Sequence, residues 1–291
     1  MKRKITLLTV ILFFSFLLTS CMTANKPLSK GIVDINLLVP NGDHDIPVVV
    51  TMPIGEGDVP AVIMMHGTGS NKDEAGNAYL MLAPMMAKAG IAAVRFDFPG
   101  SGTSTASYEL YSNSEAASDA EAVAAFVAGM AGIDKNRLGV MGWSQGGTDA
   151  LITAGSSNTF SSVLTWAGAL NLGEMATAEM RAEADKQGYT MMTFDWRDSL
   201  KLSKKWIDEA DNMDVLSYAA KIKAPLASIH GTVDTTVPFS DSEKVQAVAQ
   251  NPKSKLIPIE GADHLYGVFS GDLTVFETLA KQTIDWFKST L

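Results

Sequence analysis

Short apolar, β-branched runs alternate with longer runs of helical spacing along most of this sequence. The first two apolar runs, residues 32–39 and 47–52, flank the turn Asn41-Gly42-Asp43 and predict an antiparallel hairpin. Six further apolar runs predict strands at residues 61–65, 91–96, 138–141, 162–166, 226–230 and 255–259. Helical patterns follow at residues 75–89 and 114–130, directly after Ser144, near residues 241–249, and at residues 273–290.

This alternation is typical of an α/β fold with a mostly parallel central sheet and helices on both faces. Residues 31–291 suffice for one such domain, and no internal repeat or long linker divides them. Only residues 171–219 depart from the alternation, because that segment is irregular and prone to helix. Parallel sheets bind ligands at the carboxyl ends of their strands, so we expect the functional residues there.

The N-terminus has the features of an export signal. Three basic residues, Lys2, Arg3 and Lys4, precede an apolar stretch too short to span a bilayer comfortably. The sequence Leu-Thr-Ser before Cys21 resembles the lipobox of bacterial lipoproteins, in which cleavage leaves a lipidated N-terminal cysteine. We therefore expect a signal peptide at residues 1–20, a lipid anchor on Cys21 in a membrane of the cell envelope, and a tether at residues 21–30. A freely secreted protein and an uncleaved anchor are the alternatives.

Charge and cysteine content exclude several classes of function. The chain carries 23 basic and 32 acidic residues, a net charge of −9, and loss of residues 1–20 removes three basic residues and no acid, which gives −12. Such an acidic balance argues against binding to nucleic acid or to anionic lipid headgroups. Cys21 is the only cysteine, so no internal disulfide can form and no thiol can act elsewhere in the chain.

A Gly-x-Ser-x-Gly pentapeptide, residues 142–146, lies between the apolar run at 138–141 and a helix-forming run. In this setting the serine occupies a cramped strand-to-helix turn, where small residues are needed two positions before and after it. The turn would hold the Ser144 hydroxyl at the edge of the sheet, beside a helix N-terminus that favours negative charge. Ser144 is therefore the candidate nucleophile.

A serine hydroxyl needs a base, and the base needs an acid to orient it. Among four histidines, only His264 has the C-terminal position that the order Ser, Asp, His requires. Asp234 lies 90 residues after the serine and 30 before the histidine, just past a predicted strand, and is the candidate acid. Asp263 and Glu174 are its rivals.

A tetrahedral oxyanion needs two donors that already point at it. We expect one to be the backbone N–H of Gln145 and the other the N–H of Thr68, in a glycine-containing loop after the third strand. We expect His66 to hold this loop by hydrogen bonds rather than to transfer protons. The glycines could also mark a phosphate cradle, but no lysine follows at P-loop spacing.

These motifs, with the turn at residues 95–102, together resemble the α/β-hydrolase superfamily. More narrowly, they are similar to its cinnamoyl and feruloyl esterases and related carboxylesterases, over about residues 62–287. The resemblance implies Ser144 as nucleophile, His264 as base, Asp234 as acid, and the N–H groups of Thr68 and Gln145 as oxyanion donors. It implies a small-molecule ester substrate, with neither metal nor cofactor. The lipoprotein signal departs from this family, whose members are commonly soluble.

The same resemblance implies a cap over the active site, formed by an insertion at about residues 171–215. This segment is rich in methionine and aromatic side chains, which suit a bulky apolar acyl or aryl group. They could equally pack the insertion onto the body of the protein. The candidate pocket residues are Trp143, Trp166, Met192, Trp196 and Tyr266.

The leading functional hypothesis is a serine carboxylesterase that works through an acyl-enzyme on Ser144. A serine peptidase of the prolyl-oligopeptidase type is less favoured, because neither a propeller domain nor an acidic pair for a peptide N-terminus is evident in the sequence. The third hypothesis is a surface-tethered binding protein on a hydrolase scaffold, without catalytic activity. The presence of all three triad residues argues against it.

Overall fold

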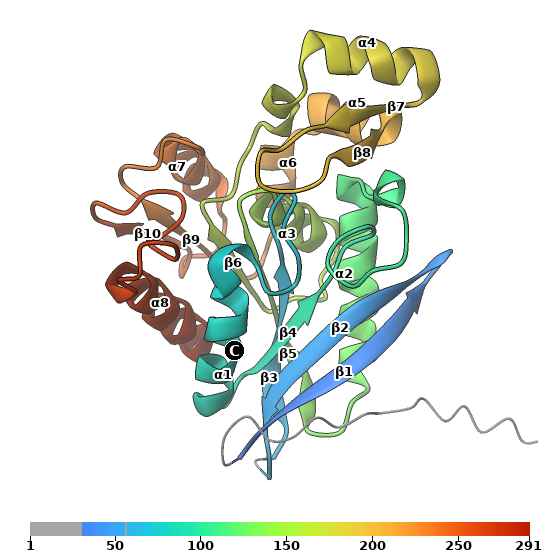
Figure 1. The fold of residues 1–291 in the computed structure, drawn as a ribbon. Helices are drawn as coiled ribbons and strands as arrows, with labels where there is room; N and C mark the ends of the chain where they lie inside the picture. The colour runs from blue at the N-terminus through green and yellow to red at the C-terminus, as the bar shows by residue number, and fades with distance from the viewer. Residues whose placement is uncertain (1–30, 56) are drawn as a thin grey trace, which may run out of the picture.

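An eight-stranded sheet forms the centre of the molecule in the computed structural model, which describes residues 31–55 and 57–291 (Figure 1). The predicted signal peptide, Cys21 and the tether at 21–30 lie outside the described residues. The strands are β1 (Ile32–Asn41), β2 (His44–Pro53), β3 (Val59–Met65), β4 (Ala92–Phe96), β5 (Ile133–Trp143), β6 (Ser162–Trp166), β9 (Leu226–Gly231) and β10 (Lys255–Ile259).

The sheet is parallel from its centre to one edge and antiparallel at the other edge. Its order is β1-β2-β4-β3-β5-β6-β9-β10, and only the pairs β1–β2 and β2–β4 are antiparallel. The predicted hairpin is therefore confirmed, with Asn41 paired to His44 across a two-residue turn. The predicted α/β architecture is confirmed as well.

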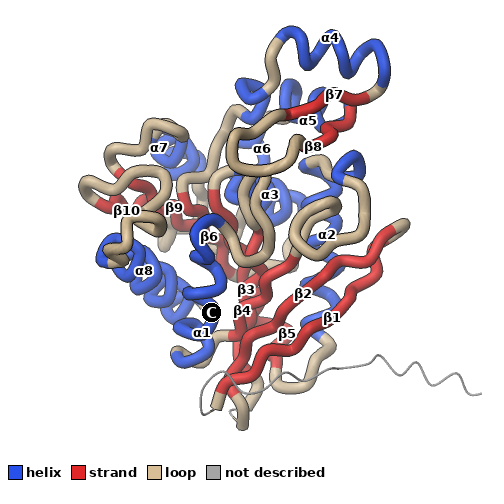
Figure 2. The backbone as a smooth tube through the Cα atoms, viewed as in Figure 1, coloured by secondary structure: helices blue, strands red, loops and turns tan. Residues whose placement is uncertain are grey.

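Helices cover both faces of the sheet (Figure 2). Helices α2 (Asn113–Ala128), α3 (Gln145–Ser156) and α7 (Phe239–Val248) contribute to one apolar core cluster, and α1 (Ala78–Lys88) and α8 (Thr274–Thr290) to another. The central strand β3 divides its side chains between them: Ile63 and Met65 join the first cluster, Val62 and Met64 the second. Successive strand residues point to opposite faces, so a strand buried on both sides is apolar throughout.

Helix α1 begins three residues later than its sequence pattern predicts. A 3-10 turn, η1 (Ala75–Asn77), precedes it, and Gly76 and Asn77 have φ angles of 59° and 61°. Right-handed helix requires negative φ, so these two residues break the helix that the apolar pattern alone would extend.

Between β6 and β9 the chain leaves the sheet and builds the segment at the top of Figure 1. A two-stranded antiparallel sheet, β7 (Tyr189–Met192) and β8 (Leu200–Ser203), was not predicted from the sequence. Each strand has only four residues, too few for a clear alternation. The other elements are η3 (Leu172–Met175), α4 (Ala178–Gln187), α5 (Lys204–Asn212) and α6 (Val215–Ala219). Within the described residues, no helix is both long and apolar enough to cross a membrane.

Gly155 allows helices α3 and α6 to approach closely, since a Cβ there would lie 2.4 Å from the Tyr218 carbonyl oxygen. We expect Gly155→Ala to lower the free energy of unfolding by about 1–3 kcal/mol, although alanine is the better helix former. Urea denaturation measures this change. Gly57→Ala is the control, because a Cβ at Gly57 meets nothing within 4 Å. A Gly155→Ala variant as stable as the parent would contradict the close approach.

Candidate active site

Ser144 occupies a strained turn between β5 and α3. Its φ and ψ angles are 57° and −122°, a conformation that costs a non-glycine residue about 1–3 kcal/mol. The turn is closely packed on both sides. A Cβ on Gly142 would lie 1.9 Å from the Gly146 carbonyl oxygen, and a Cβ on Gly146 would lie 2.1 Å from that of Met65. The two glycines of the pentapeptide are therefore required by close backbone contacts.

The Ser144 backbone is fixed to the neighbouring strand and to its own helix. Its N–H donates to the Trp166 carbonyl at the end of β6 (2.9 Å). Its carbonyl accepts from the Gly147 N–H (2.9 Å), which starts the hydrogen bonding of α3. The serine thus lies at the carboxyl ends of two adjacent parallel strands, where ligands of such sheets bind.

Asp234 and His264 meet at the same edge of the sheet, from the loops after β9 and β10. His264 Nδ1 lies 2.7 Å from Asp234 Oδ2, and the aspartate side chain is fully buried while that of histidine is 12% exposed. Because the carboxylate accepts, Nδ1 carries the proton and leaves Nε2 as the basic nitrogen. The structure therefore brings together the two residues that the sequence proposed as acid and base.

Asp234 has further partners that sequence reasoning missed. His230 Nε2 lies 3.2 Å from the same Oδ2, and the N–H groups of Thr236 and Val237 donate to Oδ1 at 2.8 and 2.9 Å. Burial acts to raise the pKa of Asp234, but hydrogen bonds from His230 and His264 overcome it and hold that pKa well below its usual range. The carboxylate is thus ionised and fixed. The sequence does contain a signal for the contact with His230, because Asp234 follows this histidine of β9 by only four residues.

The rival acids contact other groups. Asp263 accepts from the Leu265 N–H (3.0 Å), and Glu174 accepts from the Asn171 side-chain amide (2.6 Å). His66, in turn, donates from Nδ1 to the Gly67 carbonyl (2.9 Å) and accepts the Phe98 N–H at Nε2 (3.3 Å). Burial lowers the pKa of His66 to about 4, so this histidine is neutral and structural.

Among the described residues, no direct hydrogen bond joins Ser144 and His264. The Trp143 ring, one residue before the serine, has its centroid 6.1 Å from that of the His264 ring. Catalytic hydrogen bonds commonly tighten only when substrate binds, so the gap does not by itself exclude His264 as the base.

Residues 66–74, here called the oxyanion loop, follow β3 and lie against Ser144. A Cβ on Gly67 would be 3.5 Å from Ser144 Cβ. In the described chain, no protein group accepts from the N–H of Thr68 or of Gln145. The Thr68 hydroxyl donates to the Gln145 side-chain oxygen and so joins the two residues directly. Two unengaged N–H groups on linked residues beside a serine are what an oxyanion hole requires.

A buried network of hydrogen bonds holds the side chain of Gln145 in place. Its side-chain amide donates to the Tyr111 hydroxyl, which donates to Asp149 Oδ2 (2.6 Å), while Asn113 donates to Asp149 Oδ1 (2.7 Å). Burial raises the pKa of Asp149 to about 7, against the effect of these two hydrogen bonds. Gln145 and Asp149 both belong to α3, but Tyr111 and Asn113 come from the segment before and the start of α2, a pairing that no sequence pattern indicates.

Three of the five candidate pocket residues are buried aromatic side chains. Trp166 and Tyr266 have no exposed surface and pack with Trp143, which is 2% exposed. The Trp166 indole N–H donates to Thr283 Oγ1 of α8 (2.9 Å). The structure therefore places Trp166 and Tyr266 in the core, not on an accessible pocket wall; this corrects the prediction for Tyr266, whereas core packing was an equal alternative for Trp166.

The other two candidates lie in the segment between β6 and β9. Met192 is buried at 7% exposure, whereas Trp196 is 66% exposed. Trp196 packs against the oxyanion loop, since a Cβ on Gly69 would lie 3.0 Å from its ring. Arg197 donates to the Gly69 carbonyl (2.5 Å), and its guanidinium lies 5.9 Å from the Phe194 ring centroid. An aromatic and cationic loop thus borders the candidate site.

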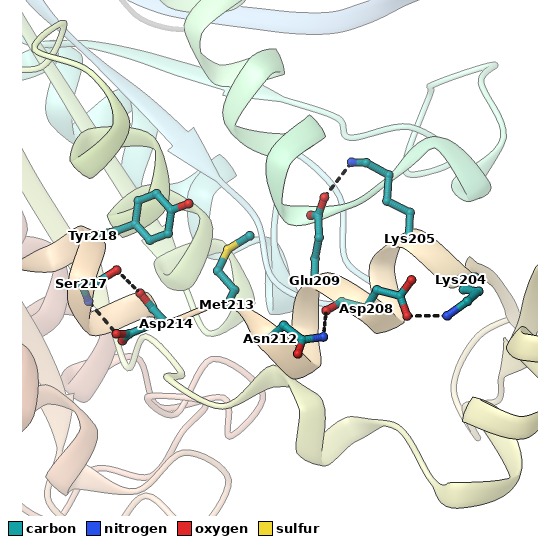
Figure 3. A pocket seen from close by; sticks show the side chains of 9 residues that line it. All are labelled: Lys204, Lys205, Asp208, Glu209, Asn212, Met213, Asp214, Ser217 and Tyr218. Carbon is teal, nitrogen blue, oxygen red and sulfur yellow. Dashed lines mark hydrogen bonds and ion pairs between the residues drawn. The ribbon is translucent and has the colours of Figure 1, made fainter.

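A groove of about 690 Å³ lies elsewhere, along α5 and α6 (Figure 3). Its lysines are paired: Lys204 with Asp208 (2.6 Å) and Lys205 with Glu209 (2.8 Å). The Ser217 hydroxyl there donates to the Asp214 backbone carbonyl (2.8 Å), not to a base. None of the residues that line this groove form a pair of nucleophile and base.

One group of side chains has the composition of a metal site. Candidate ligand atoms of His44, Glu115 and Asp119 lie within 4.8 Å of one another. His44 Nε2 lies 3.0 Å from Asp119 Oδ1, which also accepts from the Asn41 amide (2.8 Å). The histidine–aspartate pair explains this arrangement without an ion. It joins the β1–β2 hairpin to α2, away from the elements that carry Ser144.

Solved structures place this architecture in a known class. A ferulic acid complex of Est1E from Butyrivibrio proteoclasticus superimposes with a TM-score of 0.70 at 18% identity, covering 87% of this chain and 98% of that one. A monoacylglycerol lipase from Paleococcus ferrophilus gives 0.64 at 19% identity, covering 81% and 97%. The chain therefore has the α/β-hydrolase fold.

A comparison with models of protein families identifies the family of this chain. The model of the prolyl oligopeptidase family matches residues 78–291, and the chain belongs to that family. A curated relative, the uncharacterized protein YfhR of Salmonella typhi, is 26% identical over 211 residues. These cover 72% of this chain and 65% of YfhR, so the match spans less than two thirds of that relative.

The contact between Asp234 and His264 can be tested directly by NMR. We expect a low-field resonance from the His264 Nδ1 proton, because this proton is shared with a buried carboxylate. Asp234→Asn should abolish the resonance. Asp263→Asn is the matched control, since Asp263 is adjacent to the histidine but bonds its own loop. Loss of the signal in the Asp263 variant instead would show that the acid is misassigned.

Proposed function

We propose that this protein is a serine carboxylesterase that forms an acyl-enzyme on Ser144. The observation that carries the proposal is the hydrogen bond between Asp234 and His264 next to the strained turn of Ser144. A nucleophile, a base and an orienting acid at one edge of the sheet are the components of acyl transfer.

Each residue has a defined role in the proposed reaction. Ser144 Oγ attacks the ester carbonyl while its proton passes to His264 Nε2, and Asp234 stabilises the imidazolium that forms. The C–O bond to the alcohol then breaks, and the alcohol leaves with that proton. Water attacks the acyl-enzyme by the same route and releases the acid.

The oxyanion of each tetrahedral intermediate would lie between the N–H groups of Thr68 and Gln145. The hydrogen bond from the Thr68 hydroxyl to Gln145 and the link from Gln145 to Tyr111 keep the two donors in register. Donors fixed before the reaction stabilise developing charge without reorganisation, and each is worth about 10²–10³-fold in rate.

The loop beside the site favours an aryl or bulky apolar ester over a peptide N-terminus. Phe194 and Trp196 form an edge-to-face pair, 5.2 Å between ring centroids, next to the oxyanion loop. Arg197 adds a positive charge there, which disfavours a protonated amine. The ferulic acid bound to Est1E, a protein of the same fold, is an aromatic acid of this kind.

A peptidase of the prolyl-oligopeptidase type is the second candidate, because the family model itself favours it. A panel of substrates separates the two, with protein that lacks residues 1–21. We expect turnover of aryl acetates and feruloyl esters and little of Xaa-Pro anilides. The reverse preference would establish the peptidase, and failure of a fluorophosphonate probe to label Ser144 in folded protein would favour the binding-protein hypothesis.

Ser144→Ala should reduce aryl ester hydrolysis by about 10³-fold or more, because the nucleophile is lost. It should also abolish labelling by a fluorophosphonate probe. Ser289→Ala is the control, as this exposed serine lies at the end of α8. Full activity in Ser144→Ala, or labelling at another residue, would refute the proposed nucleophile.

We further propose that the enzyme is anchored to a membrane of the cell envelope through lipid on Cys21, as the sequence of its first residues predicts. Expression in a bacterial host with labelled palmitate should label the wild-type protein and not Cys21→Ala. The same substitution should move the activity from the membrane fraction to the soluble fraction. Equal labelling of both proteins would exclude Cys21 as the anchor.

A further inference from the structure

Glu74 is the one carboxylate of the oxyanion loop that lacks a cation. The loop's Asp73 pairs with Arg95, and its Lys72 pairs with Asp97 after β4 (2.9 Å). Glu74 is only 6% exposed, yet within residues 31–55 and 57–291 it forms no ion pair. A buried carboxylate without a counterion is costly unless something else requires it.

The Glu74 carboxylate holds the loop at its point of contact with the serine. Oε2 accepts from the Gly67 N–H at 2.6 Å, and Oε1 accepts from the Ala75 N–H at 2.9 Å. A Cβ on Gly67 would lie 3.5 Å from Ser144 Cβ and 3.7 Å from Glu74 Oε1. The carboxylate, the Gly67 peptide and the nucleophile therefore form one close-packed unit, with the Thr68 donor next in the chain.

The backbone of Glu74 is strained in order to make these contacts. Its φ and ψ angles are 65° and 172°, in the region that favours glycine. Strain of this kind costs about 1–3 kcal/mol and persists only where the surrounding structure fixes it. Glycine would relieve the strain but would remove the carboxylate.

The groups whose charge or hydrogen bonding is coupled to that of Glu74 come from three elements. They are Ser70 in the same loop, Tyr79 in α1, and His264 from the loop after β10. Burial raises the pKa of Glu74 to about 7, while the N–H groups of Ala75 and Gly67, Ser70 and the charge of His264 act to lower it. Glu74 thus changes charge in the range where a serine hydrolase works.

We propose that Glu74 is a positioning residue, whose carboxylate sets the oxyanion loop against Ser144 and so aligns the Thr68 donor with the nucleophile. This inference rests on the proposed esterase function. It assigns to Glu74 a role that the triad and the oxyanion donors leave open.

The charge of the Glu74 carboxylate determines the direction in which pH changes the activity. As the pH falls through about 7, Glu74 takes up a proton, loses its charge and weakens its hydrogen bond to the Gly67 N–H. The loop then holds the Thr68 donor less firmly, so this protonation should lower kcat of the wild type.

Glu74→Gln tests the proposal, with kcat and KM measured on an aryl ester from about pH 5 to 9. The amide keeps the size of the side chain but does not titrate. We expect the ratio of wild-type kcat to Glu74→Gln kcat to be largest above pH 7 and to approach 1 near about pH 5, where the wild-type carboxyl is also uncharged. At pH 8, kcat should fall by about 10-fold or more with KM changed less than about 3-fold, because the misplaced donor acts in the transition state.

Glu243→Gln is the matched control, an exposed glutamate of α7 that should leave the profile unchanged. Glu74→Asp keeps a carboxyl group on a shorter stem, so it should also lower kcat at pH 8 and serves as the second variant if Glu74→Gln does not fold. An unchanged kcat at pH 8, or a ratio to the wild type that is the same across the pH range, overturns the proposal. Full activity in Ser144→Ala would instead refute the esterase mechanism itself.

Discussion

The close contact between the first turn of α3 and the end of β3 determines the geometry of the whole site. No side chain fits at Gly142 or Gly146, because carbonyl oxygens occupy the space that a Cβ would need. A Cβ on Gly147 would lie 2.7 Å from Gly168 Cα, so the helix also abuts the chain that leaves β6. With the backbone confined on both sides, Ser144 has one way to turn, and its strained φ and ψ angles result from that confinement.

Charge fixes the loops around this turn in two different ways. Asp234, Asp73 and Asp97 are ionised acids held by histidine, arginine or lysine, and such pairs keep their loops in one position. Glu74 and Asp149 are buried acids held mainly by neutral donors, and burial raises the pKa of each to about 7. Carboxyl groups of this second kind favour folding most at low pH, and that contribution is lost as the pH rises through 7. The site therefore combines permanently charged anchors with titrating ones.

Much of this arrangement was predictable from the sequence. The strands were, because apolar runs of five or more residues with turn residues between them leave few alternatives. Ser144, Asp234 and His264 were, because the order of parallel strands brings their ends together however far apart they lie in the chain. The β7–β8 pair and the Gln145–Tyr111–Asp149 network were not, since very short strands and buried polar contacts have no periodicity. The burial of Trp166 and Tyr266 depended on which face of the loop packs against α8, and spacing along the chain does not specify this.

The bond between Arg197 and the Gly69 carbonyl has a consequence for access to the site. Gly69 follows Thr68 directly, so any excursion of the loop that carries Phe194 and Trp196 also releases the peptide next to a proposed oxyanion donor. Access and alignment then cannot vary independently: an open loop admits a molecule to a misaligned site, and only reclosure restores the donor. The hydrogen bond thus couples the position of the aromatic loop to the alignment of the proposed donor.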